Sequence, residues 1–98
     1  MAQTQIFRGV HTSTFMDNGE LIGLYRGTPV ARMKGNTITL NTGGWKSNTT
    51  KTRMNQFSNH YCGGVFKVYQ KDYSWFVSIH GKTLPFDGNT IDFVTYEV

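Results

Sequence analysis

One stretch of the chain, from Thr37 to Phe57, restricts the fold more than any other because it joins a strand pattern to a helix pattern through two glycines. Its first residues alternate, so that Ile38 and Leu40 share one face of an extended segment, as in a strand with one buried side. Gly43-Gly44 follows, and adjacent glycines permit a sharp change of direction. The sequence therefore predicts a strand, a tight turn and then a change of periodicity.

The second half of this stretch predicts one short helix near residues 49–60. Met54, Phe57 and Tyr61 fall at i, i+3 and i+7, the spacing of an apolar stripe that a helix lays on a sheet. A side-chain oxygen can cap the helix, and glycine favours its end. The candidate caps are Asn48, Thr49 and Thr50, and the expected end is Gly63-Gly64.

The rest of the chain indicates short strands separated by turns. Eleven glycines and many threonines and asparagines favour strands and turns over further helices. Residues 1–20 are expected to be irregular or to form an edge strand. The predicted strands are Leu21 to Tyr25, Val30 to Lys34, Thr37 to Leu40, Val65 to Gln70, Trp75 to His80 and Thr90 to Glu97. Gly35-Asn36 is predicted to be a two-residue hairpin loop, and Lys71 to Ser74 a longer one.

This order of elements, strands then one helix then strands, predicts an α+β fold. We expect a mainly antiparallel β-sheet of about five to six short strands, with the helix packed on it. The 98 residues are enough for a single domain, residues 1–98, with one core.

The single cysteine, Cys62, cannot form an internal disulfide. The first residues contain no long apolar run of the kind that enters or crosses a membrane. The sequence therefore predicts a cytoplasmic protein, with no membrane association.

Charge is unevenly distributed along the chain. Between Glu20 and Asp72 there are eight cations and no acidic residue, whereas acids dominate the last quarter. Such segregation would give a basic face suited to phosphates and an acidic edge suited to another partner or a second copy of the chain, as in a homo-oligomer. The alternative is that these charges intermix on the folded surface.

Residues with catalytic or metal-binding chemistry are scattered. His11, His60 and His80 lie far apart in sequence and have no metal-like spacing, and His60 with Cys62 would supply only two ligands. Cys62, close to the expected helix end, is interpreted as a small buried residue. We therefore expect no enzymatic activity, no cofactor and no metal.

The best candidate for a functional site is the segment from the glycine pair to the start of the helix. A phosphate-binding P-loop requires glycine directly before its lysine, and Trp45 stands there instead. A loop that leads into a helix can nevertheless present backbone N–H groups to an anion. The predicted ligand or partner residues are Gly43, Gly44, Trp45, Lys46, Thr49, Thr50, Lys51 and Arg53. In the alternative interpretation the glycines only permit the turn, Trp45 packs on the core and the threonines are caps.

The same segment resembles a signature of small accessory proteins of tailed bacteriophages, TLN(S/T)GGW followed by TTK, a basic residue and (M/I)NQ. The matching residues are Thr39 to Trp45, Thr49 to Lys51 and Arg53 to Gln56. Weaker similarity occurs in Val68 to Ser78 and Leu84 to Phe93. The resemblance implies expression in the bacterial host cytoplasm and a role at the interface with the host, and it implies no reaction mechanism.

Three functions are consistent with these patterns. The first is a non-enzymatic protein that binds and modulates a host protein, in host takeover or counter-defence. The second is binding of a phosphate ligand, either nucleic acid or a sequestered signal nucleotide, through the segment from Gly43 to Arg53. The third is a virion or structural component, because exposed strand edges lend themselves to assembly.

Overall fold

The protein folds into strands and one helix, arranged as predicted for an α+β chain. The computed structural model describes residues 9, 11–44 and 46–95. Within them the elements are β1 (Thr12–Asp17), β2 (Glu20–Tyr25), β3 (Thr28–Lys34), β4 (Thr37–Asn41), α1 (Asn48–Tyr61), β5 (Phe66–Lys71), β6 (Ser74–Ile79), β7 (Lys82–Pro85) and β8 (Thr90–Val94). The mainly antiparallel α+β class is confirmed, with eight strands in place of five to six.

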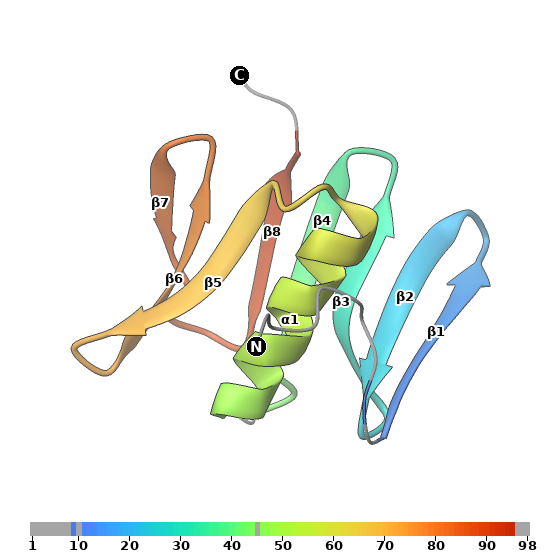
Figure 1. The fold of residues 1–98 in the computed structure, drawn as a ribbon, viewed down its shortest axis with the longest axis horizontal. Coiled ribbons are helices and arrows are strands. Elements are labelled where there is room, and N and C mark those ends of the chain that lie inside the picture. Colours follow the sequence, from blue (N-terminus) through green and yellow to red (C-terminus); the bar gives the residue numbers. More distant parts are fainter. Residues whose placement is uncertain (1–8, 10, 45, 96–98) are drawn as a thin grey trace, which may run out of the picture.

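The strands form two antiparallel sheets rather than one. The larger sheet has the order β1-β2-β3-β4-β8, and the smaller one has the order β5-β6-β7. Figure 1 shows the smaller sheet at one end of the molecule, β1 and β2 at the other, and α1 between them in front of the larger sheet. The helix contacts β5, β3 and β2, so it joins the two sheets.

Two-residue turns connect most neighbouring strands. Asn18-Gly19, between β1 and β2, has φ angles of 51° and 79°, and Asp72-Tyr73, between β5 and β6, has φ angles of 52° and 67°. Positive φ at both turn positions is the type I′ pattern that matches the twist of a hairpin. The longer loop predicted at Lys71 to Ser74 was wrong, because those two residues belong to the strands. Gly35-Asn36 is confirmed as a two-residue loop.

Both prolines lie within strands, although the predicted strands began after Pro29 and did not include Pro85. Pro29 pairs with Leu24 in β3 beside a shift in register. Pro85 pairs with Phe76 at the end of β7, a strand that the sequence did not predict. β7 is an edge strand, and an edge position can accommodate a residue without an N–H group.

The helix begins one residue earlier than the predicted caps allow. Ser47 has an extended backbone and its side chain accepts a hydrogen bond from the Thr50 N–H, so Ser47 is the N-cap. After Tyr61 the chain leaves the helix through Cys62 and Gly63-Gly64, and the Gly64 N–H donates to the Ser58 carbonyl. No helix in the described ranges is long and apolar enough to cross a bilayer.

A continuous apolar core receives side chains from both sheets and from α1. Ile38 and Leu40 are fully buried, as are Met54 and Phe57 on the helix. Side chains alternate along β6, since its core-facing side chains are buried while Phe76 remains partly exposed. The core therefore fixes which face of each strand is left for solvent or partners.

Candidate functional site

The two glycines of the predicted site have their N–H groups engaged by nearby side chains. The Gly43 N–H donates to Asn41 Oδ1 at 2.9 Å, and the Gly44 N–H donates to Thr42 Oγ1 at 3.2 Å. Gly43 has a φ of 65° and lies against the side chain of Thr28. The turn therefore requires glycine for its shape, and its N–H groups already have intramolecular acceptors.

The three cations of the predicted site contact three different parts of the fold. Lys46 Nζ donates to the carbonyl oxygens of Asp87, at 2.9 Å, and Phe86, at 3.3 Å. Lys51 Nζ donates to Gln70 Oε1 at 3.2 Å and lies 5.5 Å from the centre of the Trp75 ring. These lysines therefore tie the loop after β7 and strand β5 to the helix region.

Arg53 points toward the opposite side of the helix, where β1 and β2 lie. Its Nε donates to Thr12 Oγ1 at 3.0 Å, and its Nη1 donates to Gln56 Oε1 at 3.0 Å. The guanidinium also lies 5.6 Å from the centre of the Tyr25 ring. Arg53 therefore does not converge with Lys51 on one ligand.

The other predicted residues are at the start of the helix. Thr50 is buried, and its hydroxyl lies 3.0 Å from Ser47 Oγ, so it belongs to the cap. Thr49 is exposed on the first turn. Trp45 lies outside the described residues. The segment from the glycine pair to Arg53 thus forms a turn and a helix cap, and its cationic side chains link the helix region to neighbouring elements.

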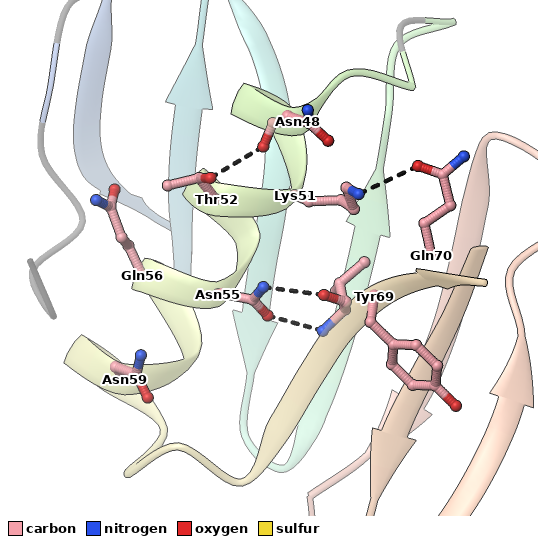
Figure 2. Close-up of a pocket in the computed structure, with 9 residues that line it drawn as sticks. Asn48, Lys51, Thr52, Asn55, Gln56, Asn59, Tyr69 and Gln70 are labelled. Carbon is pink, nitrogen blue, oxygen red and sulfur yellow. Dashed lines mark hydrogen bonds between the residues drawn. The ribbon is translucent and has the colours of Figure 1, made fainter. Parts of the chain in front are cut away.

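A groove between α1 and β5 combines Lys51 of the predicted site with polar residues that were not predicted to belong to it (Figure 2). It encloses about 390 Å³, and its lining residues are Asn48, Lys51, Thr52, Asn55, Gln56, Asn59, Val68, Tyr69 and Gln70. Asn48, Thr52, Asn55 and Asn59 follow the i, i+4, i+7, i+11 spacing of one helix face. That polar stripe was readable in the sequence, but its partner strand was not.

One amide in the groove has a structural role. Asn55 Nδ2 donates to the Val68 carbonyl at 2.9 Å, and the Val68 N–H donates to Asn55 Oδ1 at 2.7 Å (Figure 2). Asn55 thus pairs with β5 as a neighbouring strand would. Lys51 is the charged residue of the lining, so the groove offers amides, a hydroxyl and one cation.

Among the described strands, β1 lies at one edge of the larger sheet. The two-residue turn at Asn18-Gly19 pairs Asp17 with Glu20 through hydrogen bonds, and the alternation of an antiparallel ladder then points the N–H and C=O groups of Thr14 and Met16 away from β2. Among the described residues these backbone groups have no partner. We call Thr14, Phe15 and Met16 the β1 edge.

Large apolar side chains accompany these backbone groups. Phe15 is 44% exposed and Met16 is 63% exposed, and they lie on opposite faces of the strand. An exposed edge strand with apolar side chains can accept a further strand from another protein.

The Cys62 thiol has a different environment from a reactive cysteine. Burial raises the pKa of Cys62 to about 11, and its Sγ lies 3.6 Å from Met33 Sδ. It packs against the core as a partly buried side chain.

Comparison with known proteins identifies a family. The family model described as Kyanoviridae Gp96 protein matches residues 2–96. No curated protein and no solved structure matches the chain.

Proposed function

We propose that this chain, which belongs to the Kyanoviridae Gp96 protein family of phage proteins, is a non-enzymatic accessory protein that binds and modulates a host protein. The observation that supports this function best is the β1 edge. Its outward N–H and C=O groups can pair with an added strand, and the exposed Phe15 and Met16 supply apolar contacts on the two faces of that strand.

Two acidic residues lie near the β1 edge. Asp17 ends the strand, and Glu20 at the start of β2 forms an ion pair with Arg32 at 3.2 Å. Natural proteins protect strand edges with lysine, proline or an unfavourable inward charge, and the sequence of β1, TSTFMD, contains no lysine and no proline. β1 therefore lacks two of the residue types that protect such edges.

Site-specific photo-crosslinking in infected host cells tests this proposal. A photoreactive residue at Met16 should give one dominant host-protein adduct, whereas the same residue at exposed Asn36, in the turn between β3 and β4, should not. Equal adduct patterns from both positions, or no host adduct from Met16, would contradict host-protein binding at this edge.

A pair of variants at Thr14 tests strand addition itself. Thr14→Pro removes an N–H group that points away from β2, so the ladder within the sheet keeps its bonds while the added strand loses one. Thr14→Val also removes the Thr14 hydroxyl, as Thr14→Pro does, but it keeps the N–H group. We expect Thr14→Pro to abolish the Met16 adduct and Thr14→Val to retain it; equal yields from the two variants would argue against strand pairing.

A structural role in the virion is the alternative that the phage family leaves open. In that case the β1 edge would pair with another virion subunit rather than a host protein. Mass spectrometry of purified particles separates these functions, because a virion component is present in stoichiometric amounts and a host-directed accessory protein is absent.

A further inference from the structure

The smaller sheet has an outer face that combines aromatic rings with lysines. In β5 the side chains of Phe66 and Val68 are buried in the core, so the alternate positions face outward. Strand pairing places Tyr69 opposite Phe76 and Phe76 opposite Pro85. Lys67 and Lys71 lie on the same face, two residues from Tyr69 on either side. We call Lys67, Tyr69, Lys71, Phe76 and Pro85 the basic aromatic face.

The two rings of this face stack on each other across neighbouring strands. Their centroids are 5.6 Å apart and their planes differ by 28°, and both residues remain partly exposed. Pro85 is exposed beside Phe76. Partly exposed aromatic side chains on a sheet are suited to stacking on the faces of unpaired bases.

The charge of the smaller sheet favours an anionic occupant. Its three strands, FKVYQK, SWFVSI and KTLP, carry Lys67, Lys71 and Lys82 and no acidic residue. Lys67 and Lys71 are both exposed, and along a strand they lie about 13 Å apart, with Tyr69 between them. An occupant should therefore present negative charge on both sides of a flat apolar group.

The polar groove begins where the basic aromatic face ends. Tyr69 and Gln70 of β5 line the groove together with Asn48 and Asn59 of α1, and Figure 2 shows the Tyr69 ring pointing away from the helix. Amide groups carry both donors and acceptors, which match the edges of nucleobases. The groove can thus read a base edge next to a ring that stacks a base.

We propose that the basic aromatic face binds single-stranded nucleic acid, with bases stacked on Tyr69 and Phe76, phosphates beside Lys67 and Lys71, and one base edge in the groove between α1 and β5. A duplex fits less well because its bases are already stacked. An acidic protein would pair with the lysines but would have no bases to stack on the aromatic rings. This surface is separate from the β1 edge.

Fluorescence anisotropy with a labelled oligonucleotide of about 12 nucleotides, within the range bound by comparable small domains, tests this proposal. The protein should bind the single strand more tightly than the matching duplex and more tightly than polyglutamate. DNA and RNA strands of the same sequence show which sugar is preferred. Affinity that is equal for the duplex or for polyglutamate would overturn the proposal.

Two ring variants separate stacking from charge. Tyr69→Leu and Phe76→Leu keep an apolar side chain on the sheet and remove the ring, and each should lower the affinity for the single strand roughly 5- to 100-fold. A thermal melt of each variant confirms that the sheet is intact. Unchanged affinity in both variants would exclude base stacking on this face.

Matched lysine variants test the placement of the phosphates. Lys67→Gln and Lys71→Gln should each reduce the slope of log affinity against log salt by about 0.7, the value for one phosphate of a single strand. Lys34→Gln removes the same charge from an exposed site on the other sheet and should leave the slope unchanged. An equal effect of all three variants would show that only net charge matters, and would overturn the site.

The test of nucleic-acid binding is independent of the test of host-protein binding. Thr14→Pro should leave oligonucleotide affinity unchanged, and Phe76→Leu should leave the Met16 photo-adduct unchanged. A negative result for one surface therefore leaves the test of the other surface valid.

Discussion

Ser58 is a single residue on which the junction between α1 and β5 depends. It is fully buried, its hydroxyl donates to the Phe66 carbonyl at 2.7 Å, and the same oxygen accepts the Phe66 N–H at 3.2 Å. Ser58→Ala would leave both groups of Phe66 buried without a partner, and we expect a loss of about 2 kcal/mol in the free energy of unfolding. Urea denaturation measures it.

Thr52→Ala provides the control for this prediction. The Thr52 hydroxyl donates to the Asn48 carbonyl within the same helix, so its removal should change the free energy of unfolding by less than about 0.5 kcal/mol. Comparable losses in the two variants would show that the bonds to Phe66 do not stabilise the fold more than a local helix contact.

Cys62 is predicted to react slowly in the folded protein. Burial raises its pKa from 9.0 to about 11, so at pH 8 the thiolate fraction should be roughly 100-fold below that of a thiol with the ordinary pKa. Alkylation by iodoacetamide, followed by mass spectrometry, should be slow in buffer and fast in urea. Similar rates under both conditions would contradict this environment.

The same pKa gives Cys62 a defined effect on stability. Because the folded pKa is raised, the contribution to stability is complete below about pH 9 and is lost as the pH rises through about 11. Cys62→Ala removes this titration, so the difference in stability between the variant and the parent protein should change over that interval and remain constant below it.

At the scale of elements, helix α1 protects the edge of β5. Asn55 and Ser58 bond to the N–H and C=O groups of Val68 and Phe66, which alternate along the strand. Asn55→Asp replaces the donor to the Val68 carbonyl with a carboxylate oxygen, and at pH 7 it should cost about 2 kcal/mol in the free energy of unfolding.

Lowering the pH should restore part of the stability that Asn55→Asp loses. A protonated carboxyl group at position 55 can again donate to the Val68 carbonyl, so the bond favours the neutral form. The denaturation midpoint of Asn55→Asp should therefore approach that of the parent protein as the pH falls from 7 to 4. A difference that stays constant or widens over this range would contradict the paired bonds.

The sequence predicted the elements whose signals are local. The stripe of Met54, Phe57 and Tyr61 identified the helix, and Gly35-Asn36 identified a hairpin. It missed β7 because this strand has only four residues and contains Pro85, which removes a backbone donor, although an edge strand tolerates proline. It also missed the short turn at Asp72-Tyr73, because tyrosine rarely adopts the positive φ that this turn requires.

The site was harder to predict than the fold. Lys51 and Arg53 are close in sequence, but residues two apart on a helix face in different directions, and their contacts lie on β5 and β1 respectively. Conversely, Lys67, Tyr69 and Lys71 alternate along β5 and were readable as one face. The pairing of Tyr69 with Phe76, and of Phe76 with Pro85, depends on strand register and on the unexpected strand β7.

At the scale of the whole molecule, the two proposed surfaces lie at opposite ends. Figure 1 shows β1 at one end of the view and the sheet of β5, β6 and β7 at the other, with α1 between them. The core is continuous between the sheets, so the two surfaces are held in one folded unit. One chain could therefore hold a host protein and a nucleic acid strand together.

This arrangement predicts that the two ligands bind without competition. Saturating the protein with the single-stranded oligonucleotide should leave the yield of the Met16 photo-adduct unchanged, because residues that share no contacts make nearly additive contributions. The double variant Thr14→Pro with Phe76→Leu should lose the Met16 photo-adduct as Thr14→Pro alone does, and should bind the oligonucleotide as weakly as Phe76→Leu alone. If the oligonucleotide instead suppressed the adduct while Phe76→Leu relieved the suppression, the two sites would overlap or be coupled, and independent binding at opposite ends would be wrong.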